Sequence, residues 1–290
     1  MRSKFFFGIA AMLLLASCEE SFEMETNLEI GNSSEVFTAT TESEPSTRTS
    51  LSGYTNGDGC YSLYWSKGDA ISISDGVRTG VYTTGDSYSS TAKFTKTEGF
   101  ISNTASQYTA FYPSSITVSN MALPATQNYV SDNVENFPMR AVSTNKDLAF
   151  KNLCGIIRFS LKSEESGLVS ISSISLSADK GMSGTFTVGD DNAAVVSGSD
   201  GVVLNCAEAK TLYTTSTTDF NIIVPQGEYS PLKVKICDAD GKEINLVSEG
   251  TISVKRSEIT RISLTLAKST FETSLETIPI TDSDVDFTER

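Results

Sequence analysis

The side chains of this chain that could do chemistry are carboxylates and thiols, because imidazole is missing. Its 290 residues include 36 Asp and Glu and five Cys, but zero His. His is the base of Ser-His-Asp and Cys-His catalysis and a common ligand of zinc and iron, so those reactions and every His-ligated metal site are excluded. A pair of carboxylates that hydrolyses glycosides needs no His. Carboxylates scattered over an acidic chain are nevertheless usually solvated, and we predict neither an enzyme nor a cofactor.

One acidic run, Asp238-Ala239-Asp240-Gly241, resembles the start of a calcium-binding loop. A calcium loop needs further oxygen ligands and a bidentate Glu at its end, and this run has neither. We therefore predict a hairpin turn and no metal site. The alternating Asp282, Asp284 and Asp286 lie near the C-terminus without a scaffold, and we expect them to be solubilising charge.

Cys18 is the residue with the clearest chemical assignment. It follows Arg2, Lys4 and an apolar run from Phe5 to Ala16, which is the order of a secretion signal. The run is too short to remain as a helix across a bilayer of about 30 Å. Its end, Leu15-Ala16-Ser17-Cys18, resembles a bacterial lipobox, in which the cysteine receives a thioether-linked diacylglycerol before cleavage. The sequence thus predicts a signal peptide over residues 1–17 and a lipoprotein acylated at Cys18, with palmitate-type chains.

Residues 18–34 are predicted to be a lipidated acidic tether. Several acyl chains, at about 0.8 kcal/mol per buried methylene, hold a protein on a membrane far better than one chain does. Glu19, Glu20, Glu23 and Glu25 resemble the surface-export signal of Bacteroidetes-type lipoproteins, although an ordinary acidic tether fits them equally. The predicted location is a lipid anchor in the outer membrane at the cell surface. The net charge of −14 disfavours nucleic acid as a partner.

The four remaining cysteines are Cys60, Cys154, Cys206 and Cys237. An even number in an exported chain permits disulfides, and the three ways of pairing them cannot be separated by sequence. Cys154 and Cys237 lie inside apolar runs, so buried free thiols are an equally good interpretation.

The elements that must position these residues are predicted to be short β-strands. From Val36 onward, β-rich runs alternate with Gly, Asn, Asp, Ser and Pro, and no long apolar repeat has helical spacing. The last run alternates Ile262, Leu264 and Leu266, which predicts one buried face. The predicted strands are 36–40, 61–65, 70–74, 80–83, 91–95, 108–112, 148–161, 171–176, 184–188, 202–204, 220–224, 232–237, 244–247 and 259–266. The fold class is therefore all-β, with two tandem β-sandwich domains at 35–144 and 145–268 and a tail at 269–290.

Several motifs, in this order, resemble the Bacteroidetes fimbrillin-like surface lipoproteins over nearly all of the mature chain. The resemblance implies transthyretin-like sandwiches and a subunit of a pilus or adhesive fibre that functions in cell adhesion. It also implies that an arginine-specific protease removes an early strand and that a terminal strand of the next subunit fills the groove. The motifs are Phe37-Thr38-Ala39, Thr47-Arg48-Thr49-Ser50-Leu51, Trp65 to Ile73, Tyr108 to Pro113, Leu123-Pro124-Ala125-Thr126-Gln127, Phe150 to Gly155 and Val224-Pro225-Gln226-Gly227.

Arg48 is the candidate processing site under this resemblance. It lies in a polar linker, Thr41 to Ser50, where an exposed backbone is easily cut. Cleavage after Arg48 would release residues 36–40 together with the lipid. The alternative is that Arg48 is only a solvated turn residue.

The tail carries the candidate donor strand. Its apolar residues alternate with polar ones beyond the last framework strand, and Pro279 permits an edge or donated strand but not a central one. Folding back as an edge strand and disorder are the alternatives. The candidate donor residues are Leu275, Ile278, Ile280, Val285 and Phe287.

Aromatic residues leave a rival function open. Tyr54, Tyr82 and Tyr88 are predicted to be exposed and could stack on sugars, as in a surface lipoprotein that binds glycan or protein and never polymerises. An anchor or tip component of a fimbria, with host or bacterial surface ligands, is a related alternative. Trp65, which leads into the turn at Gly68-Asp69, is instead predicted to be a core residue.

Overall fold

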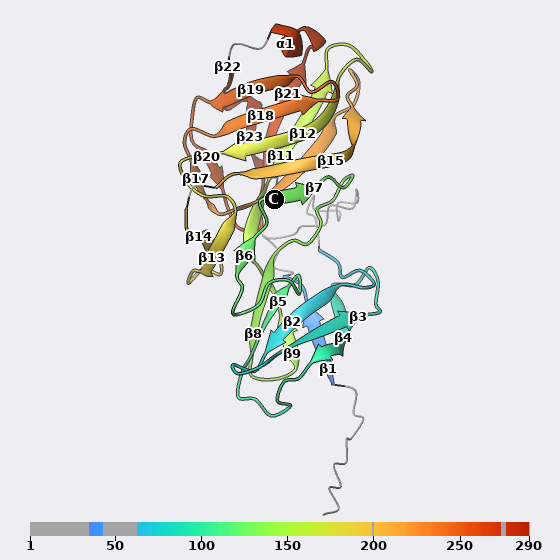
Figure 1. Cartoon of the computed structure of the whole chain (residues 1–290), viewed down its shortest axis with the longest axis vertical. Coiled ribbons are helices and arrows are strands. Elements are labelled where there is room, and N and C mark those ends of the chain that lie inside the picture. The colour runs from blue at the N-terminus through green and yellow to red at the C-terminus, as the bar shows by residue number, and fades with distance from the viewer. Residues whose placement is uncertain (1–34, 43–62, 199, 274–276, 290) are drawn as a thin grey trace, which may run out of the picture. The chain divides into compact units, whose positions relative to one another are not determined.

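The computed structural model describes residues 35–42, 63–198, 200–273 and 277–289 (Figure 1). The predicted signal peptide and tether lie outside these residues, as do Cys18, Arg48, Tyr54, Cys60 and Leu275. The described residues are almost entirely β, with one short helix, α1 (Lys268–Thr273), and one 3-10 helix at Asp282–Asp284. The predicted all-β fold class is confirmed. Within the described segments, no helix has the length and apolarity to cross a membrane.

The first sheet has eight strands in the order β10-β8-β5-β2-β3-β4-β1-β9. Neighbours are antiparallel except β1 and β9, which are parallel. Pro113 follows β5 directly, as expected for a residue that has no N–H to donate. The strands are β1 (Val36–Thr40), β2 (Ala70–Ser74), β3 (Thr79–Thr84), β4 (Thr91–Gly99), β5 (Tyr108–Tyr112), β8 (Met139–Ser143), β9 (Asp147–Ala149) and β10 (Lys151–Asn152).

Aromatic residues fill the core against this sheet. Trp65 is 1% exposed and lies edge-on to Phe94 and Phe150, with ring centroids 4.9 and 5.3 Å apart. The prediction that Trp65 is a core residue is confirmed. The predicted strand at 61–65 is wrong for the described residues 63–65, where Trp65 makes only an isolated bridge to Ser89. The chain turns at once through Gly68, whose φ of +93° is strained for any other residue type.

Two larger sheets of the second half face each other across a shared aliphatic core, which makes a β-sandwich. One has the order β16-β11-β21-β23 and the other β22-β19-β18-β12-β15-β7. Their strands are β7 (Thr126–Asn128), β11 (Cys154–Ser163), β12 (Ser170–Ser177), β15 (Val202–Thr211), β16 (Thr218–Pro225), β18 (Lys233–Asp238), β19 (Glu243–Ser248), β21 (Ile259–Leu266), β22 (Thr277–Ile280) and β23 (Val285–Glu289). Two small sheets join β6 (Ala122–Leu123), β13 (Gly184–Val188) and β14 (Ala194–Val196), and β17 (Gly227–Tyr229) and β20 (Ile252–Val254).

The apolar run predicted as one strand over 148–161 is three strands, so that prediction is wrong. β9 and β10 belong to the eight-stranded sheet, and β11 begins the four-stranded sheet. The N–H of Phe150 donates to Thr40 O (2.8 Å) at the end of the β9 ladder, and the N–H of Leu153 donates to Pro138 O (2.9 Å) at the end of the β10 ladder. The chain thus changes sheets between Asn152 and Cys154, later than the predicted boundary near Thr144. The limits 35–144 and 145–268 of two domains remain a proposal.

The side-chain amide of Gln127 hydrogen-bonds to the edge strand β16 as the backbone of a neighbouring strand would. Its side-chain Nε2 donates to Ile223 O (2.7 Å), and its Oε1 accepts from Ile223 N (2.9 Å). The segment 122–128, which contains Gln127, contributes β6, which pairs with β13, and β7, which pairs in parallel with β15. One short segment therefore ties the chain between β5 and β8 to the β-sandwich of the second half.

Replacing Gln127 with Leu should leave both backbone groups of Ile223 without these partners. We expect the free energy of unfolding to fall by about 1–3 kcal/mol, with a melting temperature lower by about 2–4 °C per kcal/mol. Thermal unfolding followed by circular dichroism measures this, and Asn128→Ala on the exposed side of β7 is the matched control. Equal melting temperatures for Gln127→Leu and the control would contradict this role.

Candidate functional site

β1 occupies an interior position in the first sheet although it is the first described strand of the chain (Figure 1). It pairs antiparallel with β4, where Phe37 faces Phe94 and Ala39 faces Ala92. On its other edge it pairs in parallel with β9, and Thr38 N donates to Lys146 O (2.9 Å). Both edges of β1 are thus hydrogen-bonded, and within the described sheet β9 pairs with no strand other than β1.

The side chains of β1 alternate between the core and the surface. Phe37 and Ala39 are fully buried, whereas Val36, Thr38 and Thr40 are half-buried. The ring of Phe37 lies edge-on to Tyr82 and Tyr108, with both centroids 5.1 Å away. Burying a Phe side chain contributes about 1.5–3 kcal/mol. Two side chains of this strand therefore complete the core.

Leu63 and Trp65, which follow the undescribed segment 43–62, form hydrogen bonds with the C-terminal end of β1 and with Thr41 just after it. Trp65 Nε1 donates to Ala39 O (3.0 Å) in a buried bond. Thr41 Oγ1 donates to Leu63 O (2.9 Å). These bonds fix the C-terminal end of β1 to the loop that leads into β2.

Glu42, just after β1, is held in a buried network. Its side chain is 2% exposed, and its Oε2 lies 2.6 Å from Arg256 Nη1. The same oxygen accepts from Asn152 N (2.9 Å) and from Ser257 Oγ (3.3 Å). Lys151 Nζ lies 3.4 Å from Oε1. Four donors converge on this carboxylate, and two of them come from the loop between β20 and β21.

The pKa of Glu42 is lowered from its usual value. Burial opposes the charged form and is the largest single influence. It is outweighed by the hydrogen bonds from Arg256 and from Asn152 N, together with the charges of Arg256 and Lys151. Because the folded pKa is depressed, this carboxylate stabilises the fold above its ordinary pKa of 4.5, and the contribution is lost as the pH falls through the folded value.

A second carboxylate marks the other end of β1. Glu35 is buried, and its Oε2 lies 3.8 Å from Lys96 Nζ. Its backbone O accepts from Lys96 N (3.3 Å). β1 is therefore bracketed by two acids, of which Glu42 has the shorter and more numerous contacts.

The predicted donor residues that are described lie in the β-sandwich of the second half. Ile278 and Ile280 belong to β22, which pairs in parallel with β19, and Ile280 is buried. Val285 and Phe287 belong to β23, which pairs antiparallel with β21. In this structure the tail folds back as two edge strands, one on each large sheet. Its role as a donor stays a prediction.

The acidic turn at Asp238 is the hairpin turn that the sequence predicts. Asp238 Oδ1 accepts from Asp240 N (2.9 Å) and Lys242 N (2.8 Å), and Gly241 has a φ of +79°. Asp284 was predicted to be only a solubilising charge. Its carboxylate instead accepts from Thr281 N (2.9 Å) and caps the 3-10 helix. Across the ranges described, His, Cys, Asp and Glu form no group of three or more that could hold a metal ion.

The three described cysteines, Cys154, Cys206 and Cys237, are free thiols. Cys154 is buried, as one of the two interpretations predicts, and burial raises its pKa far above the usual range. Burial likewise raises the pKa of Cys206 to about 11. Neither thiol is poised to react as a thiolate at neutral pH.

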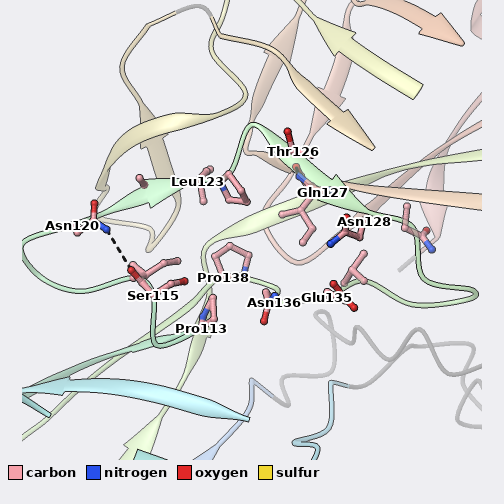
Figure 2. Close-up of a pocket in the computed structure, with 16 residues that line it drawn as sticks. Pro113, Ser115, Asn120, Leu123, Thr126, Gln127, Asn128, Glu135, Asn136 and Pro138 are labelled. Atoms are coloured by element: carbon pink, nitrogen blue, oxygen red, sulfur yellow. Dashed lines mark hydrogen bonds between the residues drawn. The ribbon is translucent and has the colours of Figure 1, made fainter. Parts of the chain in front are cut away.

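Two cavities lie beside these elements. The first, of about 320 Å³, opens near Gln127; Figure 2 shows Asn128, Glu135 and Asn136 on one side of it and Pro113, Ser115 and Asn120 on the other. The second, of about 410 Å³, has an aromatic lining that includes Tyr64, Trp65, Tyr88 and Tyr112.

Tyr88 beside the second cavity is 83% exposed, in keeping with its prediction as a surface aromatic. Tyr82 was predicted to be exposed, and that is wrong. Alternate residues of β3 face the core, and Tyr82 lies on the buried side beneath Phe37.

No protein-family model matches the chain, and no curated protein matches it. Among solved structures, it resembles a candidate cell adhesion protein from Bacteroides ovatus at 12% identity, covering 80% of this chain and 92% of that chain with a TM-score of 0.50. A candidate cell adhesion protein from Bacteroides uniformis matches at 14% identity, over 71% and 90%, with a TM-score of 0.44. A fimbrial protein from Bacteroides ovatus matches at 10% identity, over 81% and 51%, with a TM-score of 0.38. The first of these likenesses shows a shared fold, as the fimbrillin-like resemblance predicts.

Replacing Glu42 with Gln should weaken the attachment of β1. We expect the free energy of unfolding at pH 7 to fall by about 1.5–3 kcal/mol, because hydrogen bonds to a charged group are lost. The difference between wild type and Glu42→Gln should shrink as the pH drops below 4.5, because the wild-type carboxylate is then neutralised.

Urea unfolding at pH 7, 4 and 3 measures both effects, with Glu98→Gln on the exposed side of β4 as the control. A pH-independent difference would show that Glu42 contributes by packing and not by charge.

Proposed function

We propose that this chain is a cell-surface fimbrial subunit or adhesin that assembles by β-strand exchange. The observation that carries the proposal is the placement of β1. It supplies two core side chains and pairs on both edges. Its covalent connection to the other strands of the sheet runs through the segment 43–62, which holds Arg48. The fold shared with a candidate cell adhesion protein supports the same role.

Cleavage after Arg48 would turn β1 into a separate peptide. Its departure would expose the backbone groups of β4 and β9 and the pockets that Phe37 and Ala39 fill. An open edge beside an unfilled core is unstable in water and favours pairing with another strand. The processed subunit would therefore accept an extended strand with apolar side chains at alternate positions.

The tail is the proposed donor of that strand. β22 and β23 each lie at the edge of a sheet and pair on one side only. They can detach without breaking the interior ladders of the β-sandwich of the second half. Pro279 in β22 is tolerated at an edge for the same reason that it is tolerated in a donated strand.

The proposed location follows from the N-terminus. Acylation at Cys18 would hold the precursor in the outer membrane by its lipid, and cleavage at Arg48 would release it into a fimbrium. Its partners would be like subunits, with host or bacterial surface ligands reached by the assembled fibre. The role is one of adhesion and assembly, and no enzymatic step is part of it.

The second cavity favours one alternative function. Tyr64 is partly exposed and Tyr88 largely exposed beside the acid Asp69, and aromatic rings next to acids and amides can bind sugars. In that case the chain would be a non-polymerising surface lipoprotein, or an anchor or tip component, that binds glycan or protein.

Limited digestion of residues 19–290 with an arginine-specific protease tests the proposal. We expect a new N-terminus at Thr49 and a ladder of oligomers on gels run without boiling. Arg48→Ala should remain a monomer, whereas Arg78→Ala in the β2–β3 turn should still form the ladder. Monomers that persist after confirmed cleavage would favour the non-polymerising alternative.

A further inference from the structure

We propose that Arg256, Lys151, Asn152 and Ser257 form a carboxylate subsite that selects the strand replacing β1. The proposal rests on the function proposed above, because the subsite becomes vacant only when β1 and Glu42 leave. It adds a requirement that backbone pairing alone does not impose. An incoming strand must bring an acidic side chain at one defined position.

The donors of this subsite are held in place by bonds that do not involve Glu42. Arg256 Nη1 also donates to Asn152 O and to Ser257 Oγ, both at 3.1 Å. Arg256 N donates to Gln226 Oε1 (3.1 Å), and Asn152 Nδ2 donates to Ser257 Oγ (3.0 Å). The subsite should therefore keep its shape after β1 is released, which is the condition for selecting a new ligand.

The charge of the subsite makes it selective. Arg256 and Lys151 both lie within 3.4 Å of the Glu42 carboxylate, and Asn152 and Ser257 are buried. A strand with a neutral residue at this position would leave two positive charges without their acid, one of them partly buried. A carboxylate restores the ion pairs and accepts the backbone N–H of Asn152, so acidic strands should bind in preference.

The register of β1 fixes where that acid must stand. Phe37 fills the aromatic pocket, and Glu42 reaches Arg256 five residues later, with the small Ala39 between them. A strand that runs in the direction of β1 must therefore have a large apolar residue at position i and an acid at i+5.

The tail of a second copy contains this spacing. Phe271 is followed five residues later by Glu276, with Thr273 at the position of Ala39. Donation in this register requires α1 to unwind, and a helix of six residues has little stability of its own. We therefore assign the segment 271–276 of another copy, the part of the tail that precedes β22, as the occupant of the groove. Of the candidate donor residues only Leu275 lies within it, and the detachment of β22 and β23 frees this segment to reach the groove.

Peptide capture tests the subsite. Residues 19–290 are cleaved at Arg48 in the presence of a fluorescent peptide of residues 34–42, and incorporation is measured by gel filtration. We expect the Glu42→Gln peptide to incorporate at least about tenfold less well. The Thr40→Ala peptide, which loses only an exposed hydroxyl contact with Thr91 Oγ1 (3.1 Å), should stay within about threefold. A tail peptide of residues 270–277 should incorporate and should lose affinity on Glu276→Gln.

The outcomes separate the subsite from strand exchange itself. If no peptide enters the cleaved protein, strand exchange is wrong and the subsite falls with it. If the unaltered 34–42 peptide and its Glu42→Gln variant enter equally, exchange stands and the carboxylate subsite is overturned. If the 34–42 peptide enters and the tail peptide does not, the register at Phe271 is overturned.

Arg256→Met in the protein should abolish the preference for the acidic peptide. As a second measurement on the unaltered protein, the preference should disappear at pH 3, where the peptide acids are protonated.

Discussion

The structure depends on one constraint: an interior β-strand must satisfy its backbone groups on both edges while it places alternate side chains in a core. β1 meets it with five residues. It pairs with β4 and β9, and Phe37 and Ala39 complete the aromatic core around Tyr82 and Tyr108. Since any extended strand with suitable side chains could meet the same constraint, the proposed exchange would replace β1 without changing the topology of the sheet.

Polar contacts then decide how firmly β1 is held and what could replace it. The buried Glu42 connects the end of β1 to the β20–β21 loop through Arg256, and Gln127 connects the segment between β5 and β8 to β16. Both contacts are specific in geometry, because each joins one side chain to two or more groups at fixed positions. Backbone pairing would supply the affinity for a strand, and the Arg256 subsite would supply the choice among strands.

The sequence was sufficient to predict the bounds of those strands whose alternation and end signals lie within a few residues. The bounds of β1, β2, β5, β13 and β21 were predicted to the residue, because apolar alternation and stops such as Pro113 are read within a few positions. The apolar run at 148–161 misled because the residues from Asn152 to Leu161 are all buried, so the change of sheet among them leaves no trace in the pattern. β6 and β7 are too short to show a period. The contact of Glu42 with Arg256 spans 214 residues and has no signal in a single sequence.

The central claim is that β1 is replaced by the tail of a neighbouring subunit, and cross-linking in assembled fibres tests it most directly. Fibres grown from equal parts of unlabelled and isotopically labelled subunits would be treated with a lysine-specific cross-linker and digested. Lys146 Nζ lies over the ring of Phe37, so it reports on the groove, and Lys268 reports on the tail. The account predicts cross-links between Lys268 of one subunit and Lys146 or Lys151 of another, with mixed isotopes. Cross-links of Lys268 confined to its own subunit, with β1 still present in the fibre, would contradict it.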